Sequence, residues 1–183
     1  KKKIFNQFFI YFSIFFFSPF IVLKNYESKR LNFSTELKTN LDNAEIVFIA
    51  VWTPAWVDGH ADMTYIKQVA IEIWKNIDDY KVIATKSTVP VGTWDMIKNI
   101  IDEELKKRNK NVEFDIVSNP EFLKEWNAID DFKNWDRIVV WCNDENGKAI
   151  KMMKMLYSPL KSTEILVTNL YSAELIKYGA NSL

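Results

Sequence analysis

Residues 82–93 read VIATKSTVPVGT, and this stretch holds a short apolar run, a polar cluster and the start of a helical pattern. The apolar run at residues 82–85 has the length and composition of a strand buried on both faces. Pro90 lacks a backbone donor and cannot extend a strand ladder. The stretch therefore predicts a strand, an exit loop and a helix that begins around Gly92-Thr93.

The same order recurs along the chain, which predicts an α/β fold. Apolar runs of strand length also occupy residues 46–51, 114–117, 137–140 and 165–167. Apolar residues recur every three or four positions from Met63 to Ile77, with Asp62 as a cap, and from Met96 to Leu105, where basic residues follow. Alternating strands and helices of this kind form part of a doubly wound parallel (Rossmann-like) sheet.

Composition excludes several classes of protein. The 183 residues carry 24 basic and 24 acidic side chains, so no basic surface indicates nucleic-acid binding. Cys142 and His60 are the single cysteine and histidine, too few for a disulfide framework or a zinc site of the usual spacing. Cysteine usage indicates a reducing compartment, and we expect a cytoplasmic protein.

The first 23 residues differ from the rest. Lys1 to Lys3 precede a mostly apolar run at residues 4–23. Such a run is typical of a signal peptide or a membrane anchor. It also fits an artefactual or non-homologous leader, or a buried apolar segment. The chain starts without Met and ends within a helical pattern, so we expect a fragment of a longer protein.

Polar groups follow three of the predicted strands, where open parallel sheets bind their ligands. Thr53-Pro54 follows the first, Ser87-Thr88 the second, and Asn119-Pro120-Glu121 the third. Ordinary strand-to-helix loops would explain these residues equally well. Lys177 and Asn181 lie one helical turn apart, and together they could hold a developing oxyanion. A lysine on a helix is more often a surface residue.

Four segments together resemble the UDP-glucose 6-dehydrogenase family (the UDP-glucose/GDP-mannose dehydrogenases). They read AVWTP (50–54), KSTVPVGT (86–93), SNPEFLKE (118–125) and SAELIKY (172–178). The resemblance runs from about Lys29 to Leu183. It implies an apolar, non-homologous leader at 1–28, the C-terminal half of an NAD-binding domain at 29–168, and the start of a long central dimerisation helix at 169–183.

The resemblance also implies roles for individual residues, with no metal ligand among them. The implied catalytic residues are Thr88, Glu121, Lys177 and Asn181. The implied cofactor-binding residues are Thr53, Pro54, Ser87, Thr88 and Glu125. The implied substrate-binding residues are Phe122, Leu123, Lys124, Glu125, Lys177 and Asn181.

Enzymes of this family oxidise the C6 alcohol of UDP-glucose to a carboxylate with two NAD⁺ in succession, through a cysteine thioester. The chain contains neither a Gly-x-Gly-x-x-Gly loop nor the family's cysteine segment, and Cys142 is not that nucleophile. We therefore expect this chain to be inactive alone. The implied partners are UDP-glucose and a second subunit in a homodimer, and a membrane only if the leader is genuine.

Two other functions stay open at this point. The chain could be a non-catalytic, membrane-anchored module that binds a sugar nucleotide. It could also belong to a dehydrogenase that acts on GDP-mannose or a UDP-N-acetylhexosamine. The segment at 114–125 and the run at 136–140 look more like the UDP-glucose branch.

Tryptophan is unusually frequent, with 7 residues against 4 glycines. The resembled family usually has glycine at the positions of Trp52, Trp74, Trp94, Trp126 and Trp141. One hypothesis is that the source reads UGA as glycine, and counting all 7 tryptophans as glycine brings the glycine content close to the average of about 7%. The alternative is a decaying gene copy with genuine tryptophans.

Mass spectrometry of the protein isolated from its source distinguishes these alternatives. We expect glycine at positions 52, 94 and 126, because an indole would overpack sites where the family's backbone approaches its neighbours. Peptides that carry tryptophan at these positions would refute the recoding hypothesis.

Overall fold

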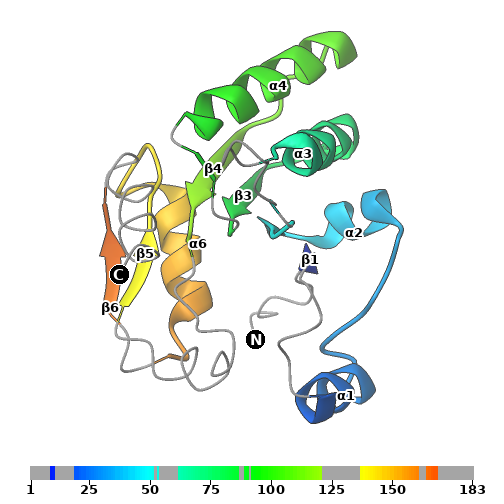
Figure 1. Ribbon diagram of the computed structural model, residues 1–183, viewed down its shortest axis with the longest axis vertical. Helices are drawn as coiled ribbons and strands as arrows, with labels where there is room; N and C mark the ends of the chain where they lie inside the picture. Colours follow the sequence, from blue (N-terminus) through cyan, green and yellow to red (C-terminus); the bar gives the residue numbers. More distant parts are fainter. Residues whose placement is uncertain are drawn as a thin grey trace.

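The computed structural model describes residues 9–10, 19–51, 53, 62–86, 89–90, 92–120, 137–160 and 164–168. Its main sheet is fully parallel and has the order β1-β2-β3-β4. β5 and β6 form a second parallel pair next to β4 (Figure 1). An antiparallel bridge between Ser118 and Trp141 connects this pair to the main sheet. The strands are β1 (Phe9–Ile10), β2 (Ile46–Ile49), β3 (Lys81–Thr85), β4 (Phe114–Ser118), β5 (Arg137–Val140) and β6 (Glu164–Val167).

The predicted strand–helix–strand–helix–strand unit is confirmed, since α3 connects β2 to β3 and α4 connects β3 to β4. The first strand ends at Ile49 and is two residues shorter than the apolar run. Helices α1, α2 and α6 were not predicted. The predicted central helix at 169–183 lies outside the described residues. The helices are α1 (Pro19–Glu27), α2 (Leu37–Asn43), α3 (Thr64–Asn76), α4 (Thr93–Arg108) and α6 (Lys148–Tyr157).

Helices cover both faces of the main sheet, as a doubly wound fold requires (Figure 1). Successive strand residues point to opposite faces, so each strand contributes to two cores. On one face Val47, Ile49 and Ile83 pack with buried residues of α2, α3 and α4. On the other, Ile46, Phe48, Val82, Ala84 and Val117 pack with Ala149, Ile150, Met153 and Tyr157 of α6.

The predicted cap of α3, Asp62, lies one residue too early: the N-cap position is Met63, which forms no side-chain cap bond. The carboxylate of Asp62 accepts a hydrogen bond from the backbone N–H of Thr64 at 2.9 Å. Hydrogen bonds from the side chain of Thr64 and then from its backbone stabilise the charged carboxylate and lower the pKa of Asp62. These bonds therefore contribute at neutral pH and are lost as the pH falls through that lowered pKa.

Arg108, the last residue of α4, forms hydrogen bonds with the carboxyl end of α3. Its guanidinium donates to the carbonyl oxygens of Trp74 at 2.8 Å and Ile77 at 2.7 Å, and it pairs with the carboxylate of Asp78. Lys110 also donates to Asp78, and Lys110 and Arg108 together lower the pKa of that carboxyl. The last carbonyls of α3 thus receive donors from the neighbouring helix instead of from water.

Trp74 lies in the core between α3 and the sheet. Its side chain is fully buried, and its ring centroid lies 4.4 Å from that of Phe114. The indole N–H finds no hydrogen-bond partner among the described residues. An unpaired buried donor costs about 1–3 kcal/mol. The core therefore accommodates the indole ring of Trp74, but the indole N–H has no hydrogen-bond partner among the described residues.

The apolar amino-terminal run contributes β1, which pairs in parallel with Val47 and Phe48 of β2. Within the described part of the chain, no helix combines the length and the apolar character needed to cross a membrane.

We expect Arg108→Ala to lower the free energy of unfolding by about 2 kcal/mol, because it leaves two helix carbonyls and a carboxylate without their donor. Arg108→Lys should lose most of the same amount, since an ammonium cannot reproduce the guanidinium fork. Urea unfolding measures both. Lys98→Ala is the control: it breaks an exposed pair with Asp102 on α4 and should cost less than about 0.5 kcal/mol.

Gly92, before the first residue of α4, has φ 90°, in the left-handed region. A Cβ at this position would meet no atom within 4 Å, so a substitution acts through the backbone alone. We expect Gly92→Ala to cost about 1–2 kcal/mol. Gly92→Asn should cost less, because asparagine tolerates this region better. Equal losses for the two variants in urea unfolding would contradict this explanation.

Candidate functional site

The carboxyl ends of the three central strands lie at the same level of the sheet. Ile49 of β2 pairs with Thr85 of β3, and Thr85 pairs with Ser118 of β4. The ladder continues one step further on both sides of β3. The backbone N–H of Lys86 donates to Ile49 at 2.8 Å, and that of Asn119 donates to Thr85 at 2.9 Å. The three predicted exits therefore leave the sheet side by side.

Of the predicted site residues, the structure describes Thr53, which is half-buried just beyond β2. The others lie outside the described residues: Pro54, Ser87, Thr88, Glu121, Phe122, Leu123, Lys124, Glu125, Lys177 and Asn181. Their roles remain predictions. For the candidate residues that follow β2, β3 and β4, the structure shows where each of these strands ends.

The exit after β3 leads directly into α4. Thr93, the first residue of the helix, is buried, and its hydroxyl donates to the carbonyl of Pro90 at 2.6 Å. The predicted start of this helix at Gly92-Thr93 is thus confirmed. A helix that begins at the carboxyl edge of a parallel sheet directs its amino-terminal partial positive charge toward that edge.

The exit after β4 starts at a fully buried polar residue, Asn119. Its amide nitrogen donates to the carbonyl of Val139 in β5 at 2.8 Å. Its side-chain oxygen Oδ1 accepts a hydrogen bond from the hydroxyl of Tyr157 in α6 at 2.5 Å. Sequence reasoning assigned Asn119 no role, and a polar residue between a buried strand and Pro120 was the one signal available.

Within the described part of the chain, the remaining reactive side chains form no alternative site. Cys142 is buried, and burial raises the pKa of its thiol, so the reactive thiolate is disfavoured. Among the described residues, no three His, Cys, Asp or Glu side chains lie close enough together to hold a metal ion.

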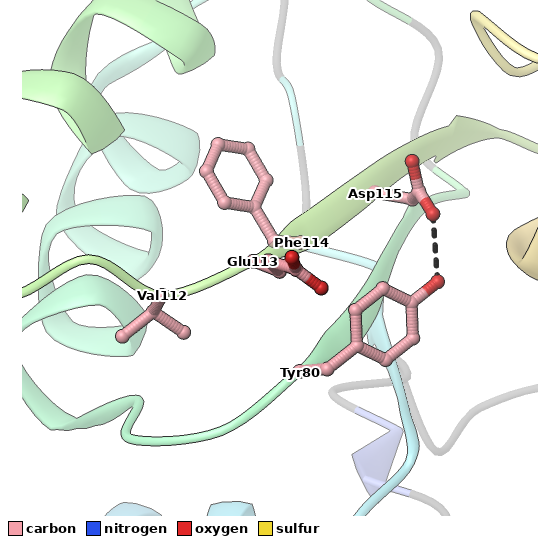
Figure 2. Close-up of a pocket in the computed structure, with 5 residues that line it drawn as sticks. All are labelled: Tyr80, Val112, Glu113, Phe114 and Asp115. Carbon is pink, nitrogen blue, oxygen red and sulfur yellow. Dashed lines mark hydrogen bonds between the residues drawn. The ribbon is translucent and has the colours of Figure 1, made fainter.

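An open pocket of about 350 Å³ lies at the amino ends of β3 and β4 (Figure 2). Its lining comes from Tyr80, which precedes β3, and from residues 112–115 at the start of β4. The hydroxyl of Tyr80 donates to Asp115 at 2.7 Å, and the ammonium of Lys148 lies 3.5 Å from the Tyr80 ring centroid. Burial and Asp115 raise the pKa of Tyr80, which therefore stays a donor. This pocket therefore lies at the other end of these strands from the predicted exits.

Comparison with known proteins identifies the family. Residues 20–161 match the model of the NAD-binding domain of the UDP-glucose/GDP-mannose dehydrogenase family. The matched segment starts at residue 20, earlier than Lys29, where the resemblance in the sequence begins.

Curated relatives agree with this match. The UDP-glucose 6-dehydrogenase of Rhizobium meliloti (strain 1021) is 44% identical over 165 residues, which cover 88% of this chain and 37% of that protein. UDP-glucose 6-dehydrogenase TuaD of Bacillus subtilis (strain 168) is 41% identical over 162 residues, 88% of this chain and 34% of that protein. The chain thus spans little more than a third of the relatives it matches.

Solved structures share the fold. A UDP-glucose dehydrogenase from Pyrobaculum islandicum superimposes with a TM-score of 0.77 at 33% identity, over 86% of this chain and 36% of that one. A GDP-mannose dehydrogenase from Pseudomonas aeruginosa gives 0.76 at 27% identity, over 87% and 37%. The predicted Rossmann-like fold is confirmed, and so is NAD as the cofactor of the family. This chain belongs to the UDP-glucose/GDP-mannose dehydrogenase family and carries part of its NAD-binding domain.

Proposed function

We propose that this chain is part of an NAD-dependent UDP-glucose 6-dehydrogenase, which oxidises the C6 alcohol of UDP-glucose to the carboxylate of UDP-glucuronate. The observation that carries the proposal is the common level at which β2, β3 and β4 end. Thr53-Pro54, Ser87-Thr88 and Glu121 follow these three strands in the sequence, and doubly wound folds bind nucleotides beyond the carboxyl ends of their strands.

The residues present fit one half of a dinucleotide site. Thr53, at the carboxyl edge of the sheet, supplies a polar group. The start of α4 supplies a helix amino terminus at the same edge. The chain has no Gly-x-Gly-x-x-Gly loop for the pyrophosphate, so that part of the site comes from elsewhere in the protein. Bound NAD⁺ supplies the hydride acceptor for both oxidation steps.

Each candidate residue then has a separate role in the reaction. Glu121 exchanges protons with the substrate through water, and Thr88 orients the reacting alcohol beside the nicotinamide. Lys177 and Asn181 stabilise the negative oxygen that develops at C6. Thr53, Pro54, Ser87 and Glu125 contact the cofactor, while the segment 122–125 lines the sugar-nucleotide pocket.

Relatives favour UDP-glucose over the other sugar nucleotides. Identity is 33% to the solved UDP-glucose dehydrogenase and 27% to the solved GDP-mannose dehydrogenase. The protein would act in the cytoplasm, where sugar nucleotides and NAD⁺ are available and a lone cysteine stays reduced. The segment 169–183 would begin the central helix of a homodimer, after the leader at 1–28 and the NAD-binding part at 29–168.

The test is oxidation of UDP-glucose by the longest natural protein that contains this chain, followed as NADH formation. We expect two NADH per UDP-glucose, with Glu121→Gln lowering kcat by about 10²–10⁴-fold, because general acid–base catalysis contributes that much. Glu103→Gln, an exposed position on α4, is the matched control and should keep full activity. The 183-residue chain alone should show no turnover.

Oxidation of GDP-mannose or of a UDP-N-acetylhexosamine in place of UDP-glucose would change the substrate assignment. Binding of UDP-glucose without any NADH formation would refute the enzymatic assignment in favour of a non-catalytic module.

A further inference from the structure

Asn119 joins three elements at the point where the chain leaves β4. Its backbone N–H is bonded to Thr85 of β3, and its side chain is bonded to Val139 of β5 and Tyr157 of α6. Just before it, the N–H and the C=O of Ser118 are both paired with the backbone of Trp141, at 3.0 and 2.9 Å. The last residues before Pro120 are therefore fixed from both sides of the strand.

The two side-chain bonds of Asn119 fix the orientation of its amide. The NH₂ group must face the carbonyl of Val139, so the amide oxygen must face Tyr157, whose hydroxyl is the donor. Burial raises the pKa of Tyr157, which keeps this hydroxyl protonated. Both residues are buried, so a lost bond would leave an amide group without a partner.

Glu121 follows Asn119 by two positions, with only Pro120 between them. Proline fixes its own φ, so the direction in which the chain leaves the sheet depends strongly on how Asn119 is held.

We propose that Asn119 and Tyr157 are positioning residues, which aim the segment that begins at Pro120 and carries Glu121 at the reacting alcohol. This inference rests on the proposed function. Neither residue touches the substrate: Tyr157 acts from α6 through Asn119, and Asn119 acts through the backbone of Pro120.

The experiment compares two tyrosine variants in the longest natural protein that contains this chain. Tyr157→Phe removes the hydroxyl bonded to Asn119, just beyond the carboxyl end of β4. Tyr80→Phe removes the hydroxyl bonded to Asp115, at the amino end of the same strand (Figure 2). The chemical change is identical, although Tyr80 is half-buried and bonds a carboxylate, whereas Tyr157 is buried and bonds a neutral amide.

We expect Tyr157→Phe to lower kcat for UDP-glucose oxidation by about tenfold to a hundredfold, because small misplacements of catalytic groups have effects of this size. The KM for NAD⁺ should stay within about twofold, since a local reorientation leaves cofactor contacts from other strands in place. Tyr80→Phe should change neither quantity. Asn119→Ser, which removes both side-chain bonds without burying a charge, serves as a second variant if Tyr157→Phe does not fold.

Hydrogen exchange of the peptide spanning residues 119–125 gives a readout that needs no substrate. Faster exchange in Tyr157→Phe but not in Tyr80→Phe supports the inference. Equal exchange in both, or a lower melting temperature with unchanged kcat, overturns it. If the wild-type protein oxidises no sugar nucleotide, the proposed function fails, and the exchange comparison still decides whether Tyr157 holds this segment.

Discussion

The parallel register of β2, β3 and β4 is the constraint on which the rest of the structure depends. It aligns Ile49, Thr85 and Ser118 in one row across the sheet. A slip of one residue would turn every core side chain to the opposite face, and it would also shift one exit loop relative to the others. Core packing and the geometry of the candidate site are therefore decided by the same backbone pairing, and neither can change alone.

The central strands could be predicted because they are short, continuous and rich in Val and Ile, as strands buried on both faces are. All three lie within two residues of the predicted bounds. Helix α2 could not be found in this way, since Leu41 is its one buried residue and a single residue makes no pattern. Helix α6 does carry an apolar face, at Ala149, Ile150, Met153 and Tyr157, and was overlooked.

For the site, the sequence pattern predicted the edge of the sheet, and the family resemblance supplied the roles of single residues. Asn119 shows why physical patterns go no further. Its partner Tyr157 lies 38 positions away on a helix that covers one face of the sheet. Nothing in the spacing of the sequence connects these two residues, because a side-chain hydrogen bond of this kind exists only once the strands and the helix have assembled.

The two ends of the sheet are held by different kinds of interaction. At the amino end, Arg108 and Lys110 meet the exposed carboxylate of Asp78, whereas at the carboxyl end the amide of Asn119 and the hydroxyl of Tyr157 are neutral and buried. Dissolved ions screen exposed charges over about 8 Å at physiological ionic strength, but they barely affect buried neutral bonds. High salt therefore loosens the junction of α3 and α4 and leaves the edge that carries the candidate site in place.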